Sequence, residues 1–258
     1  MSKCKTVSVT NQKGGVGKTT TAINLAAGLS RKLKNVLLID MDGQANATQG
    51  LGLDKKDKSG ESLYEVLVGD TEPRDIIKPT KIKFLDIIPA SVHLNGAKVE
   101  LVSVEQREFR LKNALNKIKD SYDYIIIDSP PSLDLLTINA LTASDSTIIP
   151  IQCEYYALEG LGQLINTLSR VKRGLNPELE IEGVVLTMYD RRTNLSFQVK
   201  ENIKSHFKGA VYDTVIPRNV RLAEAPSFGK TIFQYDSSSS GAYAYENLAE
   251  EFLRINNN

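Results

Sequence analysis

The sequence has 258 residues, which is the length of one α/β domain or at most two small ones. Hydrophobic residues make up 41% of the chain and charged residues 24%, a balance that excludes a disordered or fibrous protein. There are 32 basic and 31 acidic residues, so the formal net charge of +1 gives no general attraction to nucleic acid or to membrane surfaces.

Short β-branched runs alternate with longer helical patterns along the whole chain. Several of the predicted strands are continuously apolar, as expected where helices cover both faces of a parallel sheet. The predicted strands span residues 6–10, 36–40, 84–88, 124–128, 147–151 and 183–187, and a further strand leads into residues 215–221. The predicted helices span residues 18–32, 61–68, 104–119, 134–143, 157–173, 194–207 and 241–254. This alternation predicts right-handed βαβ units in one doubly wound α/β domain, with a mostly parallel sheet, over residues 1–258.

Three of the predicted strands run into segments rich in chemically active side chains, at residues 11–20, 40–48 and 128–131. Ligands bind beyond the carboxyl ends of the strands in open parallel sheets. The three segments are therefore expected to meet in one binding site.

The first of these segments reads Asn-Gln-Lys-Gly-Gly-Val-Gly-Lys-Thr-Thr and leads into a run of good helix formers. Its glycines allow backbone amides to approach a polyphosphate, and the helix N-terminus adds partial positive charge. Lys18 is placed to neutralise β- and γ-phosphate oxygens, and the Thr19 hydroxyl to ligate Mg²⁺. Gln12 occupies the first glycine position of the strict phosphate-loop pattern, and a glycine-rich turn with surface lysines is the alternative interpretation.

The same segment resembles the deviant Walker A motif of the ParA/MinD family of P-loop ATPases, in which Lys13 matches the signature lysine. The resemblance covers nearly the whole chain, down to residues 241–250, and is greatest for the small chromosomal Soj/ParA proteins. It implies an ATP- and Mg²⁺-dependent homodimer in which Lys13 reaches the phosphates of the partner, so that charge neutralisation depends on dimerisation. Lys13 and Gly14 then lie at the interface. The residues expected to contact ATP in this loop are Lys13, Gly14, Gly15, Val16, Gly17, Lys18, Thr19 and Thr20.

Two carboxylates, Asp40 and Asp42, follow each other two residues apart at the end of the second predicted strand. The resemblance implies that Asp42 positions the attacking water and that Asp40 orients the magnesium shell. An Asx-type turn that caps the next segment is the alternative. Relatives usually carry proline where Gly43 stands, and the looser glycine backbone predicts a more mobile segment and slower hydrolysis.

Asp128 ends the apolar run Tyr-Ile-Ile-Ile-Asp, and the pair Pro130 and Pro131 follows it. The pattern predicts a buried strand that delivers a Walker B carboxylate, which holds Mg²⁺ through water; a helix N-cap aspartate is the alternative.

Pro217 and Asn219 match family positions that lie against adenine. A strand-ending turn with a surface asparagine would produce the same local pattern.

Residues 191–230 contain eight lysine or arginine residues against three acidic ones, which gives a local net charge of +5. A solvated charged face is the default interpretation of such a run. However, the basic residues come from several predicted elements, and relatives bind DNA non-specifically through arginines that match Arg192 and Arg221. The resemblance therefore implies phosphate contacts with steep salt dependence and little sequence preference. The predicted DNA-binding residues are Arg192, Arg221, Lys200 and Lys230.

Together these features predict a partitioning switch: a slow Mg²⁺-dependent ATPase whose ATP-bound homodimer coats nucleoid DNA until a ParB/Spo0J-type partner triggers hydrolysis and release. The phosphate loop begins by residue 11, which leaves no room for an N-terminal helix-turn-helix domain. The segment 155–160 is expected to line the dimer contact or to pack in the core. Two alternatives stay open: a MinD-like or cargo-positioning ATPase that does not act on DNA, and an ATP-dependent ligase on the same fold.

A cytoplasmic location is predicted from three features of the sequence. Cys4 and Cys153 are too few for a disulfide framework or a four-ligand zinc site, and free thiols suit a reducing compartment. The N-terminus lacks the apolar stretch of a signal peptide. No run approaches the roughly 18 apolar residues of a membrane span, and the acidic, polar residues 250–258 make a poor membrane anchor.

Overall fold

The computed structural model describes residues 4–54, 61–154, 157–207 and 209–256. Within these residues, an eight-stranded sheet has the strand order β3-β4-β2-β5-β1-β6-β7-β8. Neighbouring strands pair in parallel except for the short β3, which runs antiparallel to β4. The strands are β1 (Lys5–Val9), β2 (Val36–Asp40), β3 (Lys78–Pro79), β4 (Leu85–Ile88), β5 (Tyr124–Asp128), β6 (Ser146–Gln152), β7 (Glu180–Tyr189) and β8 (Val211–Pro217).

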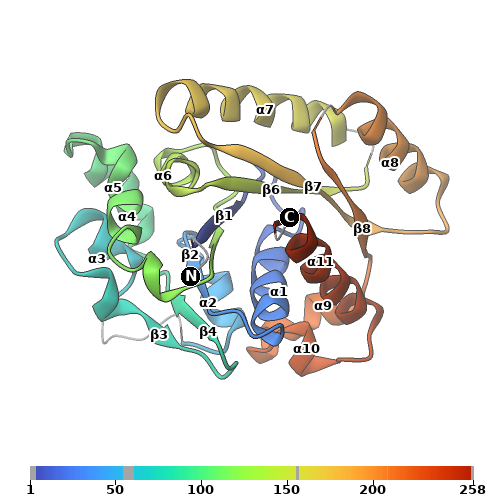
Figure 1. Ribbon diagram of the computed structural model, residues 1–258, viewed down its shortest axis with the longest axis horizontal. Helices are drawn as coiled ribbons and strands as arrows, with labels where there is room; N and C mark the ends of the chain where they lie inside the picture. The colour runs from blue at the N-terminus through green and yellow to red at the C-terminus, as the bar shows by residue number, and fades with distance from the viewer. Residues whose placement is uncertain (1–3, 55–60, 155–156, 208, 257–258) are drawn as a thin grey trace.

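Helices cover both faces of this sheet, with α7 on one side and α1 and α11 on the other (Figure 1). The first layer contains α3 (Leu63–Val68), α4 (Leu94–Glu100), α5 (Arg110–Leu115), α6 (Leu135–Ala143), α7 (Ala157–Gly174) and α8 (Asn194–His206). The second layer contains α1 (Lys18–Arg31), α2 (Asn46–Gly50), α9 (Val220–Glu224), α10 (Ile232–Tyr235) and α11 (Ser240–Asn256).

The continuously apolar strands are explained by this two-sided burial. In β2, Val36 and Leu38 pack in the core beside α1, whereas Leu37 and Ile39 pack in the core on the opposite face. Successive side chains of a strand point to opposite faces, so a central strand needs apolar residues at every position. The predicted α/β class with a mostly parallel sheet is confirmed, and the extent of a single domain over residues 1–258 stays a prediction.

The predicted helix over 104–119 is wrong for most of its length. Only Arg110–Leu115 is α-helical, with short 3₁₀ turns at Arg107–Phe109 and Lys119–Ser121. Gln106 adopts a left-handed backbone with φ of 52°, which an α-helix does not accommodate. The sequence pattern also missed α4, which lies just before this region.

The register of the sheet brings the three segments of interest to one edge. Asp128 at the end of β5 is level with Val9 at the end of β1 on one side, and with Asp40 at the end of β2 on the other. The loop after β1 and the acidic residues after β2 therefore start beside Asp128. Among the described residues, none of the helices has both the length and the apolar character needed to span a bilayer.

Candidate nucleotide site

The glycine-rich loop between β1 and α1 is fixed by hydrogen bonds from both sides. The Asn11 side chain donates to the Pro150 carbonyl at 2.8 Å and accepts from the Lys13 amide at 2.9 Å. On the other side, the Thr187 hydroxyl donates to the Val16 carbonyl at 2.8 Å. These contacts join the loop to β6 and β7, so its shape is set before any ligand binds.

The glycines leave the outer side of this loop open. Gly15 and Gly17 have φ values of 76° and 89°, a left-handed conformation that favours glycine. A Cβ atom built on Gly14 or Gly15 would meet no described atom within 4 Å. Gly17 is also the N-cap of α1 and supplies no side-chain hydrogen bond, so the amides of the first helical turn stay available to an anion.

Lys18 folds back over the loop instead of extending into solvent. Its side chain is almost fully buried, and Nζ donates to the Lys13 carbonyl at 2.8 Å. Burial lowers the pKa of the Lys18 ammonium, and the charges of Asp128 and Asp42 partly oppose that shift. A buried ammonium close to two carboxylates is suited to a polyphosphate that carries a divalent cation.

Asp128 presents a buried carboxylate whose oxygens are suited to a cation. Its side chain is fully buried, and neither carboxylate oxygen has a hydrogen-bond partner among the described residues. Burial raises the pKa of Asp128 well above its usual range, and the nearby Asp40 carboxylate raises it further. The Thr19 hydroxyl lies close enough to lower that pKa without completing a hydrogen bond. A buried carboxylate without partners is costly alone, and Asp128 together with Thr19 offers the oxygen ligands that a cation such as Mg²⁺ prefers.

The alternative interpretation of Asp128 as a helix N-cap is wrong. The N-cap of the helix that follows, α6, is Asp134, whose Oδ1 accepts from the Leu136 and Thr137 amides. Asp128 is thus left free for another partner.

Asp40 holds the following loop in place. One of its oxygens accepts from the Asp42 amide at 3.1 Å, and the other accepts from both the amide and the hydroxyl of Thr48 at 2.8 Å. Burial raises the pKa of Asp40 to about 6, although these hydrogen bonds act in the opposite direction. Thr48, which the sequence analysis missed, also accepts from the Ala90 amide and so connects the loop to the end of β4. Any effect of Asp40 on a bound magnesium ion would pass through this network.

Asp42 forms the Asx turn that was the alternative interpretation of this segment. Its Oδ1 accepts from the Gln44 amide at 2.9 Å, and its carbonyl accepts from the Ala45 amide at 2.8 Å. Its Oδ2 makes no hydrogen bond within the described part of the chain and is free to bind a water molecule. The turn therefore fixes Asp42 without occupying the whole carboxylate.

Gly43 is buried, and its φ is not positive, so the backbone here needs no glycine-specific conformation. Instead, the amide of Asn95 on α4 lies over it: a Cβ atom at position 43 would come within 2.6 Å of Asn95 Oδ1. A larger residue at position 43 would therefore require the exposed Asn95 side chain to move. Any gain in mobility over a proline stays a prediction.

Lys13 lies at the exposed end of the loop, where it forms an ion pair with Glu154 just after β6. The neighbouring Gln12 donates through Nε2 to Gln163 Oε1 on α7 at 2.7 Å. The sequence analysis identified neither contact partner. Residues 155 and 156, which were expected near a dimer contact, lie outside the described residues.

Pro217 and Asn219 lie at the end of β8, and the side chain of Asn219 is already engaged. Asn219 caps α9 by accepting from the Arg221 amide at 2.8 Å, and its Nδ2 donates to Ser240 Oγ at 2.8 Å. This is the local turn of the alternative interpretation, and a contact of either residue with adenine stays a prediction.

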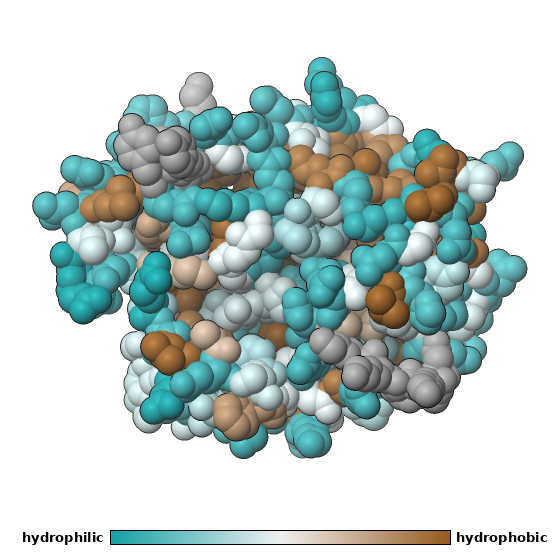
Figure 2. Space-filling model, turned by 180° about the vertical axis from the view of Figure 1, so that it is seen from behind, coloured by the Kyte–Doolittle hydropathy of each residue, from teal (hydrophilic) through white to brown (hydrophobic). Residues whose placement is uncertain are grey.

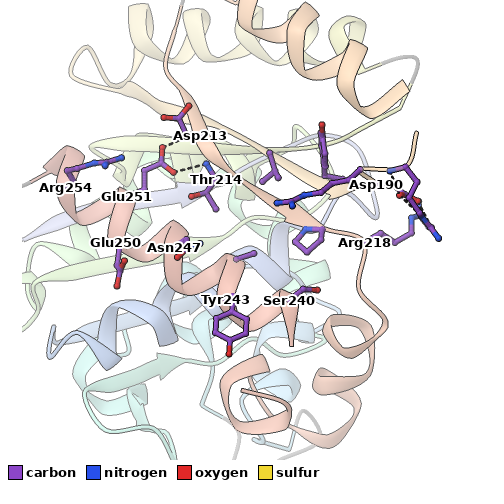
Figure 3. Close-up of a pocket in the computed structure, with 16 residues that line it drawn as sticks. Asp190, Asp213, Thr214, Arg218, Ser240, Tyr243, Asn247, Glu250, Glu251 and Arg254 are labelled. Carbon is purple, nitrogen blue, oxygen red and sulfur yellow. Dashed lines mark hydrogen bonds and ion pairs between the residues drawn. The ribbon is translucent and has the colours of Figure 1, made fainter. Parts of the chain in front are cut away.

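A cavity of about 1330 Å³ lies beside Pro217, between β8, α11 and the turn after β7 (Figure 3). No residue of the glycine loop lines it, and neither does Asp128. Glu251 on α11 points toward β8 and accepts from the Asp213 and Thr214 amides at 2.7 and 2.9 Å. The cavity belongs to the basic segment rather than to the phosphate loop.

The predicted DNA-binding residues are not all brought together. Arg192 lines this cavity and is bonded to Asp190 by its Nε and Nη2, while its side chain is 87% exposed. Arg221 is paired with Glu224 at 2.9 Å and Asp236 at 3.5 Å. Like Arg221, the other two predicted residues, Lys200 and Lys230, do not line the cavity.

The reverse face of the molecule is mostly hydrophilic (Figure 2). Apolar residues form separate patches on it rather than one continuous surface. Scattered exposed apolar residues are ordinary for a folded domain.

Comparisons with known proteins agree with this geometry. Residues 4–181 match the family described as an AAA domain. The chain is 60% identical over 247 residues to the sporulation initiation inhibitor protein Soj of Bacillus subtilis. This alignment covers 96% of this chain and 97% of that protein. It is 52% identical over 248 residues to the chromosome partitioning protein ParA of Myxococcus xanthus, and the alignment covers 96% of this chain and 87% of that protein. A similar solved structure is cobyrinic acid a,c-diamide synthase from Mycobacterium smegmatis with bound ATP analog and magnesium. The two structures superimpose with a TM-score of 0.86 at 38% sequence identity, and the match covers 97% of this chain and 95% of that chain.

Proposed function

Because this chain belongs to the Soj/ParA family of chromosome-partitioning ATPases, we propose that it is an ATP-driven switch whose ATP-bound homodimer binds DNA and releases it after hydrolysis. The observation that carries the proposal is the open glycine loop, with Lys18 folded over it and the buried Asp128 carboxylate without a partner. Its cofactors are ATP and Mg²⁺.

The loop residues provide a binding surface for the triphosphate. The open backbone of Gly14 and Gly15 leaves room for the phosphates, and the free amides at the start of α1 donate hydrogen bonds to their oxygens. Lys18 neutralises part of the phosphate charge. The Thr19 hydroxyl and, through water, Asp128 would hold Mg²⁺, with Asp40 in its outer shell. Held by these residues, Mg²⁺ would supply positive charge that offsets the negative charge developing during phosphoryl transfer.

Hydrolysis depends on two further side chains. The free Oδ2 of Asp42 orients a water molecule, while the Asx turn keeps the carboxylate in a fixed position. Lys13 adds the second cation from the partner subunit, so that full charge neutralisation occurs only in the dimer. Such an enzyme is a slow ATPase, because the ATP-bound state must last long enough to occupy DNA.

The DNA surface of this proposal is built from arginines that are already paired with carboxylates. Arg192 and Arg221 exchange those carboxylates for DNA phosphates, which favours non-specific binding that weakens with salt. A ParB/Spo0J-type protein acts as the partner that triggers hydrolysis, and the protein is associated with the nucleoid rather than with a membrane.

The decisive experiment is DNA co-sedimentation with ATP, ADP or no nucleotide across a salt series. We expect pelleting with ATP only, and a logarithmic salt slope of about −0.9 for each DNA phosphate that is neutralised. Equal pelleting in all three nucleotide states would contradict the proposal, as would a preference for anionic liposomes over DNA.

Gly14→Val is the matched control for dimerisation in that experiment. The chain itself has room for the new side chain, because no described atom lies within 4 Å of a Cβ at this position. The variant should therefore fold and bind nucleotide, yet stay monomeric because the valine would crowd the facing subunit. A normal ATP-dependent dimer of Gly14→Val in light scattering would show that the loops do not face each other.

A further inference from the structure

Two side-chain contacts hold the first half of the glycine loop from the same direction. Lys13 forms an ion pair with Glu154, and Gln12 is hydrogen-bonded to Gln163. Both partners lie after the carboxyl end of β6, one immediately before α7 and one within it. The exposed end of the loop is thus tied to a single neighbouring segment.

The two lysines of the loop are held in different ways. Lys18 is almost fully buried and donates to a backbone carbonyl of the loop itself, so the fold of the loop holds its ammonium in place. Lys13 is half-exposed, and within the described part of the chain Glu154 is its one carboxylate partner. Its position therefore depends on the charge of a single side chain that lies 141 residues away in the sequence.

We propose that Glu154 is a positioning residue for Lys13, which holds the ammonium within its own subunit before nucleotide and partner are present. This inference rests on the proposed function, because it assumes that Lys13 acts on the phosphates of the facing subunit. The Glu154 carboxylate competes with those phosphates for the Lys13 ammonium, so we expect the carboxylate to be displaced when the dimer forms. Glu154 thereby opposes premature pairing of subunits.

The size of this effect follows from the exposure of the pair. The side chains of Lys13 and Glu154 are 50% and 29% exposed, so solvent screens much of their attraction. Partly exposed ion pairs change an equilibrium constant by about two- to fivefold. Glu154 is therefore expected to adjust the dimerisation threshold rather than to block dimerisation.

The first test is the ATP-analog-dependent dimerisation of Glu154→Gln, measured by sedimentation velocity over a protein concentration series. Glutamine keeps the size of the side chain and removes its charge. We expect the dimer dissociation constant to fall by about two- to fivefold at low salt, with a smaller difference at high salt. The concentration of protein that gives half-maximal ATPase activity should fall with it, while kcat at saturating protein is unchanged. The matched control is Glu178→Gln, which removes an exposed acidic residue between α7 and β7 and should have no effect.

The second test needs no dimer. In the nucleotide-free wild-type chain, acetylation of Lys13 by an amine-reactive ester should be slowed by its carboxylate partner, and mass spectrometry gives the rate for each lysine. We expect Glu154→Gln to speed the labelling of Lys13 by about two- to fivefold. The labelling of the exposed Lys230 should not change and serves as the internal reference for folding.

The outcomes separate this inference from the proposed function. If the wild-type chain stays monomeric with the ATP analog, the proposed function fails. If the wild-type chain dimerises but Glu154→Gln alters neither dimerisation nor Lys13 labelling, only the role of Glu154 fails. Weaker dimerisation of Glu154→Gln would also overturn the inference, because it would place the carboxylate in the interface rather than against its own lysine.

Discussion

The glycine loop and the basic segment both present cations, but they hold them by different means. In the loop, the Lys18 ammonium is buried and donates to a backbone carbonyl. In the basic segment, the guanidinium of Arg192 is exposed and bonded to the carboxylate of Asp190. The position of Lys18 is set by the fold, whereas that of Arg192 is set by the Asp190 carboxylate, which a phosphate would replace if the proposed DNA binding holds.

This difference predicts how strongly each region responds to substitution. A buried charge interacts through a low local dielectric, so the loss of Lys18 removes a strong contact with a ligand. Exposed ion pairs are screened by water and salt and contribute little individually. Substitutions in the loop should therefore have large effects on nucleotide binding, whereas those in the basic segment should have smaller, salt-dependent effects on DNA.

Lys18→Ala should have the largest effect. Charge-assisted hydrogen bonds contribute about 1.5–3 kcal/mol each, and Lys18 can make more than one to a triphosphate, so the affinity for ATP should fall at least about 100-fold. Isothermal titration calorimetry with Mg²⁺-ATP measures the change. Lys230→Ala removes an exposed lysine and is the control that should bind ATP normally. Comparable ATP binding by Lys18→Ala would remove the phosphate loop from the site.

Arg221→Glu should have a smaller effect, confined to DNA. We expect DNA retention at low salt to fall about tenfold, because one phosphate contact is lost and one like charge is added. ATP-dependent dimerisation should be intact. Co-sedimentation measures the first quantity and light scattering the second.

Two further variants sharpen the test of Arg221. A glutamate at position 221 would face Glu224 and Asp236, so Arg221→Gln serves as the milder variant that removes the charge without adding repulsion. Arg173→Glu on the exposed surface of α7 changes the net charge by the same amount as Arg221→Glu. An equal loss of DNA binding in Arg173→Glu would show that net charge, rather than position, controls retention.

The same contrast explains which parts of the site could be predicted from the sequence. The loop, Asp40 and Asp128 were predicted to converge because each directly follows a strand, and a parallel sheet places those strand ends along one edge. Local sequence order and sheet topology are sufficient for that prediction. The sequence pattern alone was also sufficient for the α/β class.

Contacts between side chains of distant elements could not be predicted in this way. The pairing of Lys13 with Glu154 depends on how the segment just after β6 lies against the loop, and no local sequence pattern predicts that distance. At Gly43 the sequence indicated only a flexible residue, while the structure supplies the overlying amide of Asn95. The helix expected over 104–119 was interrupted at Gln106, whose left-handed backbone no helical periodicity reveals.

Asp128→Asn should have the smallest effect, a change in the free energy of unfolding, and it tests the role of the buried side chains in the nucleotide site. The raised pKa of Asp128 means that the folded chain favours the neutral carboxyl more than the unfolded chain, in which the group ionises near its usual value of 3.8. The free energy of unfolding of the nucleotide-free protein therefore falls as the pH rises above about 4, as Asp128 and Asp40 are forced to ionise. Asparagine stays neutral, so at pH 7.5 the variant should be more stable than the wild type by about 1 kcal/mol, or roughly 2–4 °C in Tm.

Thermal unfolding at pH 5 and pH 7.5, with and without Mg²⁺-ATP, measures this difference. Without ligand, the advantage of Asp128→Asn should shrink at the lower pH, because the wild-type carboxyl is then neutral as well. With ligand, the order should reverse at pH 7.5, because only the carboxylate provides a charge for the cation. If Asp128→Asn lowered the stability of the ligand-free protein, the carboxylate would have a partner within the fold. Asp128 would then be held by a neighbour, as Arg192 is held by Asp190, and the contrast between the nucleotide site and the basic segment would fail at Asp128.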